Sequence, residues 1–132
     1  MNSSKSSIDR RTSPRVWMYL PLEYQLKHAP RACGGIVIDA SETGFHIYST
    51  ESIPLGTKMK IDVLFPKKYE LANFQVLAEI VWKKVSVDMK GKGFQYGLRF
   101  VQILEEDSRK LKELLSDRST SEDFSNHLWN KP

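Results

Sequence analysis

The sequence predicts an all-β fold, a six-stranded antiparallel β-barrel followed by one α-helix. Apolar and polar residues alternate along most of the chain, which is the pattern of strands that bury one face. These runs are separated by short connections that contain glycine, proline and small polar residues. Helical spacing of leucines follows the last of the runs. Consecutive strands with short connections and no helix between them are typical of antiparallel barrels and sandwiches.

The first three predicted strands differ in length and regularity. Residues 16–26 are rich in β-branched and aromatic side chains, which predicts a strand. Pro21 in its middle predicts that this part lies at a sheet edge or in a bulge. Residues 28–35 end in two glycines and are predicted to turn before a short apolar strand over 36–38. After a polar turn, residues 45–48 resume the strand pattern.

The last three predicted strands, over residues 57–65, 71–85 and 94–100, carry the most regular alternation. A glycine-containing loop over 88–93 joins the last two as a hairpin. The residues predicted to face the core are Met59, Ile61, Val63 and Phe65, then Phe74, Val76, Ala78, Ile80 and Trp82, and finally Phe94, Tyr96, Leu98 and Phe100. Each of these strands is therefore predicted to be half-buried.

The predicted helix spans residues 104–116, with acidic residues in its first turn and lysines later, in agreement with the helix macrodipole. Its apolar face, which we expect to cover one end of the barrel, consists of Leu104, Leu111, Leu114 and Leu115. Residues 117–132 are polar apart from Phe124, Leu128 and Trp129. Two interpretations of this segment stay open: a short amphipathic turn that docks on the domain or a partner, and disorder.

The chain is predicted to form one compact domain with a polar segment at each end. A length of 132 residues is the usual size of one domain, and 40% hydrophobic residues with a mean hydropathy of −0.43 argue against wholesale disorder. We assign residues 1–9 to a flexible N-terminal arm, residues 10–116 to the domain and residues 117–132 to a polar C-terminal tail. The net charge of +4 favours anionic partners.

Several functions are disfavoured by what the sequence lacks. Cys33, the single cysteine, cannot form an internal disulfide, and no Cys/His spacing resembles a metal site. No apolar run approaches the ~20 residues of a membrane span or forms a signal region, so we expect a cytoplasmic protein. His46 is interpreted as a hydrogen-bonded strand histidine and Cys33 as an inert thiol. We therefore expect no enzyme, no metal and no cofactor.

Two motifs carry the prediction of function. Three arginines fall within residues 10–15, just before the first strand, and a guanidinium fork matches phosphates and the acceptor edge of guanine. The motif Asp39-x-Ser41-x-x-Gly44 lies in the turn between the second and third strands, where short polar side chains bond nearby amides and glycine permits close backbone approach. If the arginine segment folds back over the barrel, the two motifs form one site for an anionic ligand.

With Arg11-x-x-x-Arg15 and the Asp/Ser/Gly motif in this order, the sequence resembles the PilZ domain family, which binds the bacterial second messenger cyclic di-GMP. The resemblance covers residues 10–115 and includes the Tyr-Gly-Leu-Arg-Phe segment at 96–100, typical of the last strand, and a closing helix. It implies a β-barrel receptor that binds cyclic di-GMP, changes conformation and signals to a partner protein that the sequence does not identify.

The resemblance also implies the ligand-binding residues, which are Arg10, Arg11, Arg15, Asp39, Ser41 and Gly44. The two motif arginines would contact guanine edges and phosphates, the carboxylate and the hydroxyl would hydrogen-bond the nucleotide, and the glycine would permit close approach. The arginine at position 10, just before the motif, would favour a stacked pair of nucleotides over a single one.

Alternatives remain for one residue and for the function. The alternation with Ile80 predicts that Trp82 faces the core, but Trp82 is also a candidate aromatic wall against a stacked base. A small basic barrel could instead bind single-stranded nucleic acid, but Phe94, Tyr96 and Phe100 are predicted to face inward, which disfavours this partner. A PilZ-like adaptor that does not bind the ligand is disfavoured by the intact motifs.

Overall fold

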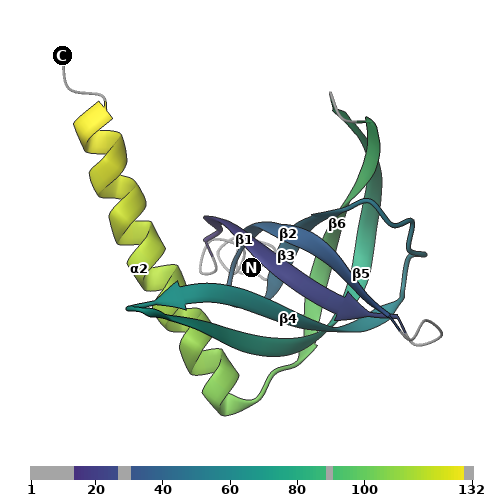
Figure 1. The fold of residues 1–132 in the computed structure, drawn as a ribbon, viewed down its shortest axis with the longest axis horizontal. Coiled ribbons are helices and arrows are strands. Elements are labelled where there is room, and N and C mark those ends of the chain that lie inside the picture. Colours follow the sequence, from purple (N-terminus) through teal and green to yellow (C-terminus); the bar gives the residue numbers. More distant parts are fainter. Residues whose placement is uncertain (1–13, 27–30, 89–90, 130–132) are drawn as a thin grey trace, which may run out of the picture.

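The computed structural model describes residues 14–26, 31–88 and 91–129. Within these residues the chain forms six antiparallel strands in a closed barrel, followed by a helix (Figure 1). The elements are β1 Val16–Gln25, β2 Ala32–Ala40, β3 Gly44–Ser49, β4 Lys58–Lys67, β5 Glu70–Asp88, β6 Gly91–Gln102 and α2 Glu105–Trp129. Their order around the barrel is β1-β2-β3-β6-β5-β4, and pairing of β1 with β4 closes the ring. The predicted fold class is confirmed.

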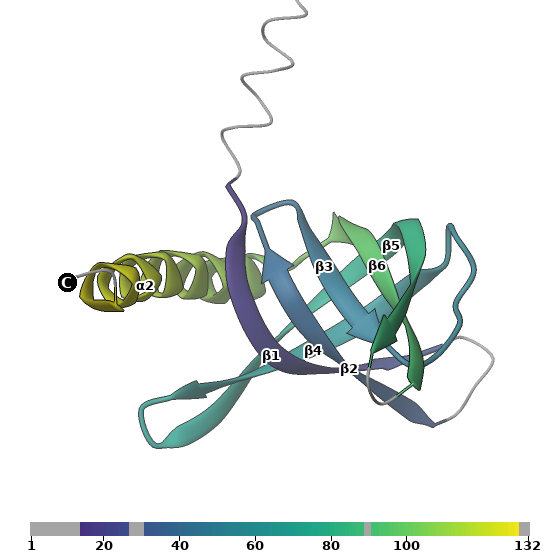
Figure 2. The same ribbon diagram turned by 90° about the horizontal axis from the view of Figure 1, so that it is seen from above.

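The core lies inside the ring of strands that Figure 2 shows from above. The predicted inward residues that are buried are Met59, Ile61, Val63, Phe65, Phe74, Val76, Ala78, Ile80, Tyr96 and Leu98. Phe94 and Phe100 are partly buried against this core. Phe45 of β3 packs edge-on against Phe100, with ring centroids 4.7 Å apart. The period-two pattern therefore predicted the core correctly at these positions.

β1 contains an irregularity close to the position that Pro21 predicted. The register between β1 and β2 shifts between Trp17 and Leu20, and Tyr19 has a φ of 49°. Pairing of β1 with β4 begins at Leu22, directly after the proline. Proline has no N–H to donate to a neighbouring strand, so it is accommodated where this ladder starts.

The prediction of a turn over residues 28–35 is wrong for residues 32–35, which belong to a strand. Residues 28–30 lie outside the described residues. β2 begins at Ala32 and includes both glycines. A Cβ on Gly35 would lie 2.6 Å from the carbonyl oxygen of Tyr48 on β3. The glycine is therefore explained by the close approach of two strands and not by a turn.

The alternation of β5 ends at Trp82. The register between β5 and β6 shifts between Ile80 and Trp82, as in a β-bulge. Ile80 is buried, whereas Val81 is 50% exposed and Trp82 is 41% exposed. The prediction that Trp82 faces the core is therefore wrong, because the bulge turns the indole to the outer surface.

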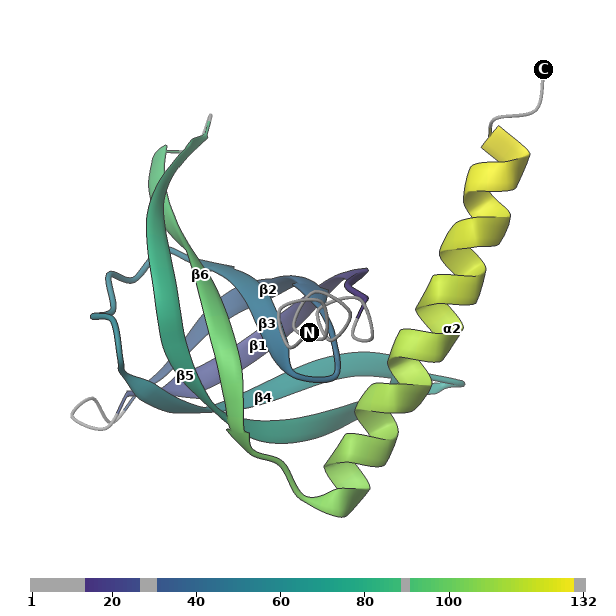
Figure 3. The same ribbon diagram turned by 180° about the vertical axis from the view of Figure 1, so that it is seen from behind.

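α2 begins near its predicted start and is longer than predicted. Its buried residues are Leu111, Leu114 and Leu115, and the helix contacts β1 and β5, whereas Leu104 precedes the helix and is 65% exposed. Figure 3 shows the second half of the helix extending away from the strands. Residues 117–129 continue the helix, and their assignment with 130–132 to a separate tail stays a prediction. Among the described residues, no helix is both long and apolar enough to cross a membrane.

Candidate functional site

A groove lies on the outer wall of the barrel, over the adjacent strands β2, β3, β6 and β5. Its volume is about 500 Å³, which is within the range of small-molecule sites. The lining residues that determine its chemistry are Arg15, Asp39, Gly44, His46, Trp82 and Arg99. The groove therefore brings together residues from both sequence motifs and from the last two strands.

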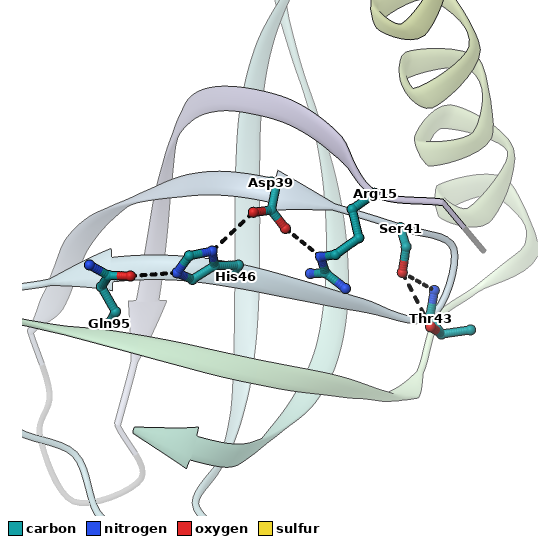
Figure 4. A network of polar contacts seen from close by, with 6 residues as sticks. All are labelled: Arg15, Asp39, Ser41, Thr43, His46 and Gln95. Atoms are coloured by element: carbon teal, nitrogen blue, oxygen red, sulfur yellow. Dashed lines mark hydrogen bonds and ion pairs between the residues drawn. The ribbon is translucent and has the colours of Figure 1, made fainter. Parts of the chain in front are cut away.

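Arg15 and Asp39 form an ion pair in the groove (Figure 4). Arg15 lies just before β1, and its Nε donates to Oδ1 of Asp39 on β2 over 2.5 Å. Asp39 is 8% exposed, and a carboxylate at this depth needs charged or hydrogen-bonding partners. The contact to Asp39 uses Nε, and the two terminal nitrogens are further donors of the same guanidinium. Arg15 can therefore hold the carboxylate and still present donors to an anion.

His46 on β3 contacts the other oxygen of the same carboxylate. Its Nδ1 lies 2.9 Å from Oδ2 of Asp39, and its Nε2 lies 2.7 Å from Oε1 of Gln95 on β6. The prediction of a hydrogen-bonded strand histidine is confirmed. Sequence reasoning missed His46 as a neighbour of the site, because its contact with Asp39 depends on the register between β2 and β3.

The Asp/Ser/Gly motif forms the turn between β2 and β3. The Ser41 amide donates to the Gly44 carbonyl over 3.0 Å, and Ser41 Oγ accepts from the Thr43 amide over 3.2 Å. Ser41 is 1% exposed, so its hydroxyl stabilises the turn. A Cβ on Gly44 would lie 2.2 Å from the carbonyl oxygen of Leu98. The glycine is required here because β3 and β6 approach closely.

A second glycine makes room for Trp82 on the groove wall. A Cβ on Gly97 of β6 would lie 1.9 Å from Nε1 of Trp82, so the indole occupies the space of the missing side chain. The ring of His46 lies beside it, with centroids 5.3 Å apart. Sequence reasoning missed Gly97, although a glycine inside a strand is a sign of close approach. Trp82 thus presents an aromatic face in the groove.

Arg99 on β6 places another guanidinium at the groove. It pairs in register with Gly44 of β3 and with Glu79 of β5, and its Nη2 lies 2.5 Å from Oε1 of Glu79. Its side chain is 61% exposed. Sequence reasoning treated Arg99 as part of a strand segment and missed it as a groove residue, although its outward position in the alternation was visible.

Most of the candidate residues that the structure describes meet at this groove. Arg15, Asp39, Gly44 and Trp82 line it, Ser41 lies in the adjoining turn, and Arg10 and Arg11 lie outside the described residues. Within the described part of the chain, no group of three or more His, Cys, Asp or Glu side chains is placed to hold a metal ion. Guanidinium donors, a fixed carboxylate and an indole face are groups that can bind a molecule with anionic groups and planar rings.

A sequence model of the PilZ domain matches residues 9–117, and this chain belongs to the PilZ domain family. The match includes every described strand and the first half of α2. A comparison with curated proteins gives no match.

Solved structures share this fold at low sequence identity. MrkH from K. pneumonia, in its apo state, has a TM-score of 0.69 and 10% identity over 83% of this chain and 51% of its own. The Bacillus subtilis inhibitor of motility, MotI/DgrA, has a TM-score of 0.68 and 16% identity over 85% of this chain and 52% of its own. The PilZ domain of YcgR from Escherichia coli, solved with c-di-GMP, has a TM-score of 0.63 and 17% identity over 89% of this chain and 98% of its own. The chain therefore spans about half the length of MrkH and MotI/DgrA.

Proposed function

We propose that this chain is a cyclic di-GMP receptor and not an enzyme, and that the ligand binds in the groove beside Asp39. The observation that carries the proposal is the Arg15–Asp39 ion pair, which joins the two sequence motifs at one groove of about 500 Å³. Membership of the PilZ family and the likeness to a YcgR domain solved with c-di-GMP support the choice of ligand.

The groove offers the contacts that a guanine nucleotide needs. The terminal nitrogens of Arg15 can donate to guanine O6 and N7 or to a phosphate, and Asp39 can accept from the N1 and N2 groups of the base. Trp82, 41% exposed, offers a face on which a base can stack. Ser41 is 1% exposed, so a direct bond from its hydroxyl to the nucleotide requires the turn to rearrange.

We infer that residues 10–15 close over the nucleotide and that this closure is the signal passed to a separate protein in the cytoplasm. Each residue of a segment that becomes ordered on binding costs about 1–2 kcal/mol of backbone entropy. Several charge-assisted bonds must therefore form together. Arg11 would add a second guanidinium, and Arg10 would favour a stacked pair of nucleotides.

Isothermal titration with cyclic di-GMP tests this proposal. Wild type is expected to bind, and Arg11→Ala and Arg15→Ala are each expected to weaken binding by at least about 100-fold, because a charge-assisted contact to the ligand is lost. The melting temperature of the free Arg15 variant should fall only slightly, because His46 still contacts Asp39 and the Arg15 side chain is 47% exposed.

The matched control is Arg31→Ala, which removes an arginine that is 71% exposed and lies 3.8 Å from Glu51, outside the groove. This variant should bind like wild type. Failure of wild type to bind, or an equal loss in the Arg31 variant, contradicts the proposal. Titration with a single-stranded RNA oligonucleotide tests the alternative function, and we expect no binding.

A further inference from the structure

Asp39 is held from two sides, and one of these sides lies outside both sequence motifs. Arg15 donates to Oδ1 over 2.5 Å, and Nδ1 of His46 lies 2.9 Å from Oδ2. The side chains of Asp39 and His46 are only 12% and 22% exposed. The orientation of the carboxylate in the groove is therefore fixed as much by His46 as by Arg15.

His46 is itself held by residues of two neighbouring strands, β6 and β5. Nε2 of His46 lies 2.7 Å from Oε1 of Gln95 (Figure 4). Nε2 of Gln95 in turn donates to Ser86 Oγ over 3.2 Å. The indole of Trp82 lies against the imidazole, with ring centroids 5.3 Å apart. These partners on β6 and β5 hold the imidazole ring in its orientation toward Asp39.

Nδ1 of His46 can donate to Asp39 in both protonation states. With Gln95 as it lies here, Oε1 toward His46 and Nε2 toward Ser86, a charged ring donates at both nitrogens. A neutral ring protonated on Nδ1 still donates to Asp39, and the Gln95 amide then turns over so that its nitrogen donates to Nε2. Protonation therefore leaves the hydrogen bond to Asp39 in place and changes the charge of the groove.

That change of charge affects an anionic ligand directly. The groups that face His46 or share its groove are Asp39 from β2, Arg15 before β1, Gln95 from β6, Trp82 from β5 and the Arg99–Glu79 pair across β6 and β5. With His46 neutral, the charges of the Arg15–Asp39 and Arg99–Glu79 ion pairs cancel, and the groove has no net charge. With His46 protonated, the groove carries one net positive charge, and imidazole titrates near neutral pH.

We propose that His46 is a positioning residue, which fixes Asp39 for the nucleotide and makes ligand affinity increase as the pH falls toward 6. The inference rests on the proposed function, because it assumes that the anion in the groove is cyclic di-GMP. Neither the phosphodiesters nor the guanine bases of this ligand change protonation between pH 6 and pH 8. A pH dependence of binding in this range therefore comes from the protein.

Titration calorimetry with cyclic di-GMP at pH 6 and pH 8 tests the inference. The Kd of wild type should be about three- to tenfold lower at pH 6, as expected for one added charge near a dianion. His46→Ala should raise the Kd at pH 8 about tenfold, because Asp39 loses its second anchor. His46→Asn places an amide nitrogen where Nδ1 was, so it should keep the pH 8 affinity within about threefold and lose the pH dependence.

The matched controls are His28→Asn and His127→Asn, which replace the other two histidines of the chain and should retain the pH dependence. A pH dependence that persists in His46→Asn, or wild-type affinity of His46→Ala at both pH values, overturns the inference. Failure of wild type to bind at either pH overturns the proposed function instead, so the two failures are distinguishable.

A measurement on unmodified protein covers the case in which His46→Ala does not fold. In NMR spectra of wild type, the pH midpoint of the His46 ring signals should move upward on adding cyclic di-GMP, because a ligand that prefers the protonated state stabilises it. An unchanged midpoint with saturating ligand overturns the inference.

Discussion

The barrel contains two polar networks that differ in charge and in exposure. The tyrosine network, defined as Tyr24, Ser49 and Tyr96 with the backbone of residues 51 and 53, is neutral, and its side chains belong to residues that are at most 2% exposed. The groove network, defined as Arg15, Asp39, His46 and Gln95, contains an ion pair whose arginine side chain is 47% exposed. We infer that the first network stabilises the fold and the second remains available to a ligand.

Alkaline pH should separate the two networks most strongly. Burial raises the pKa of Tyr24 to about 12, and burial also raises the pKa of Tyr96. Above pH 10 the unfolded chain releases these protons while the folded chain keeps them, so the stabilisation is complete below pH 10 and is lost as the pH rises toward 12. For Tyr24 this loss is about 3 kcal/mol, from two pKa units.

Urea unfolding between pH 9 and pH 12 measures this effect. The free energy of unfolding of wild type should fall steeply across the range, and that of Tyr24→Phe should fall less. If the free energy of unfolding depends on pH in the same way in both proteins, Tyr24 does not contribute to the loss of stability at alkaline pH.

The next largest effect is expected from Tyr96→Phe. The Tyr96 hydroxyl accepts from the Ile53 amide over 2.8 Å and donates to the Glu51 carbonyl over 2.5 Å, so its removal leaves a buried amide without its acceptor. We expect a loss of about 2 kcal/mol in the free energy of unfolding, measured in urea. Affinity for cyclic di-GMP should stay within about twofold of wild type, and a large loss of affinity would break the separation between the networks.

Asp39→Asn should reduce the affinity for the ligand more than the stability of the fold. The amide oxygen can still accept from Arg15, but the charge that both Arg15 and His46 contact is removed. We expect a loss of stability of about 1 kcal/mol and at least a tenfold loss of affinity for cyclic di-GMP. A stability loss as large as that of Tyr96→Phe, with unchanged affinity, would reverse the roles assigned to the two networks.

The smallest effect on stability is expected from Trp82→Phe. The indole is 41% exposed, so the free energy of unfolding should change by less than about 0.5 kcal/mol. Cyclic di-GMP should quench tryptophan fluorescence in wild type and should not do so in this variant. Trp17→Phe is the matched control, because Trp17 is 48% exposed and lies outside the groove, and it should retain the quenching.

The sequence predicted the fold wherever one local rule decides the position of a side chain. In β4 the alternation is unbroken, and Met59, Ile61 and Val63 are buried as predicted. The rule failed at Trp82, because a bulge depends on how two strands pair and leaves no local pattern. It also failed at the end of α2, because the residues after 116 continue the helix without the leucine spacing that identified it.

The candidate site divides in the same way. Asp39, Ser41 and Gly44 were predictable because turn chemistry is local to a few consecutive residues. His46 and Arg99 were not, because their partners are set by the register between strands, which sequence alone did not determine. Sequence reasoning thus identified the motif residues and missed the strand residues that hold them.

The Arg15–Asp39 bond means that the unliganded groove contains its own anion. An inorganic phosphate or sulfate ion entering the groove meets a guanidinium whose charge Asp39 already balances, so it gains little Coulomb energy from the remaining donors. A nucleotide gains more, because its bases add stacking and hydrogen bonds. The carboxylate of Asp39 therefore weakens the attraction of the groove for the simple anions that surround any protein in a cell.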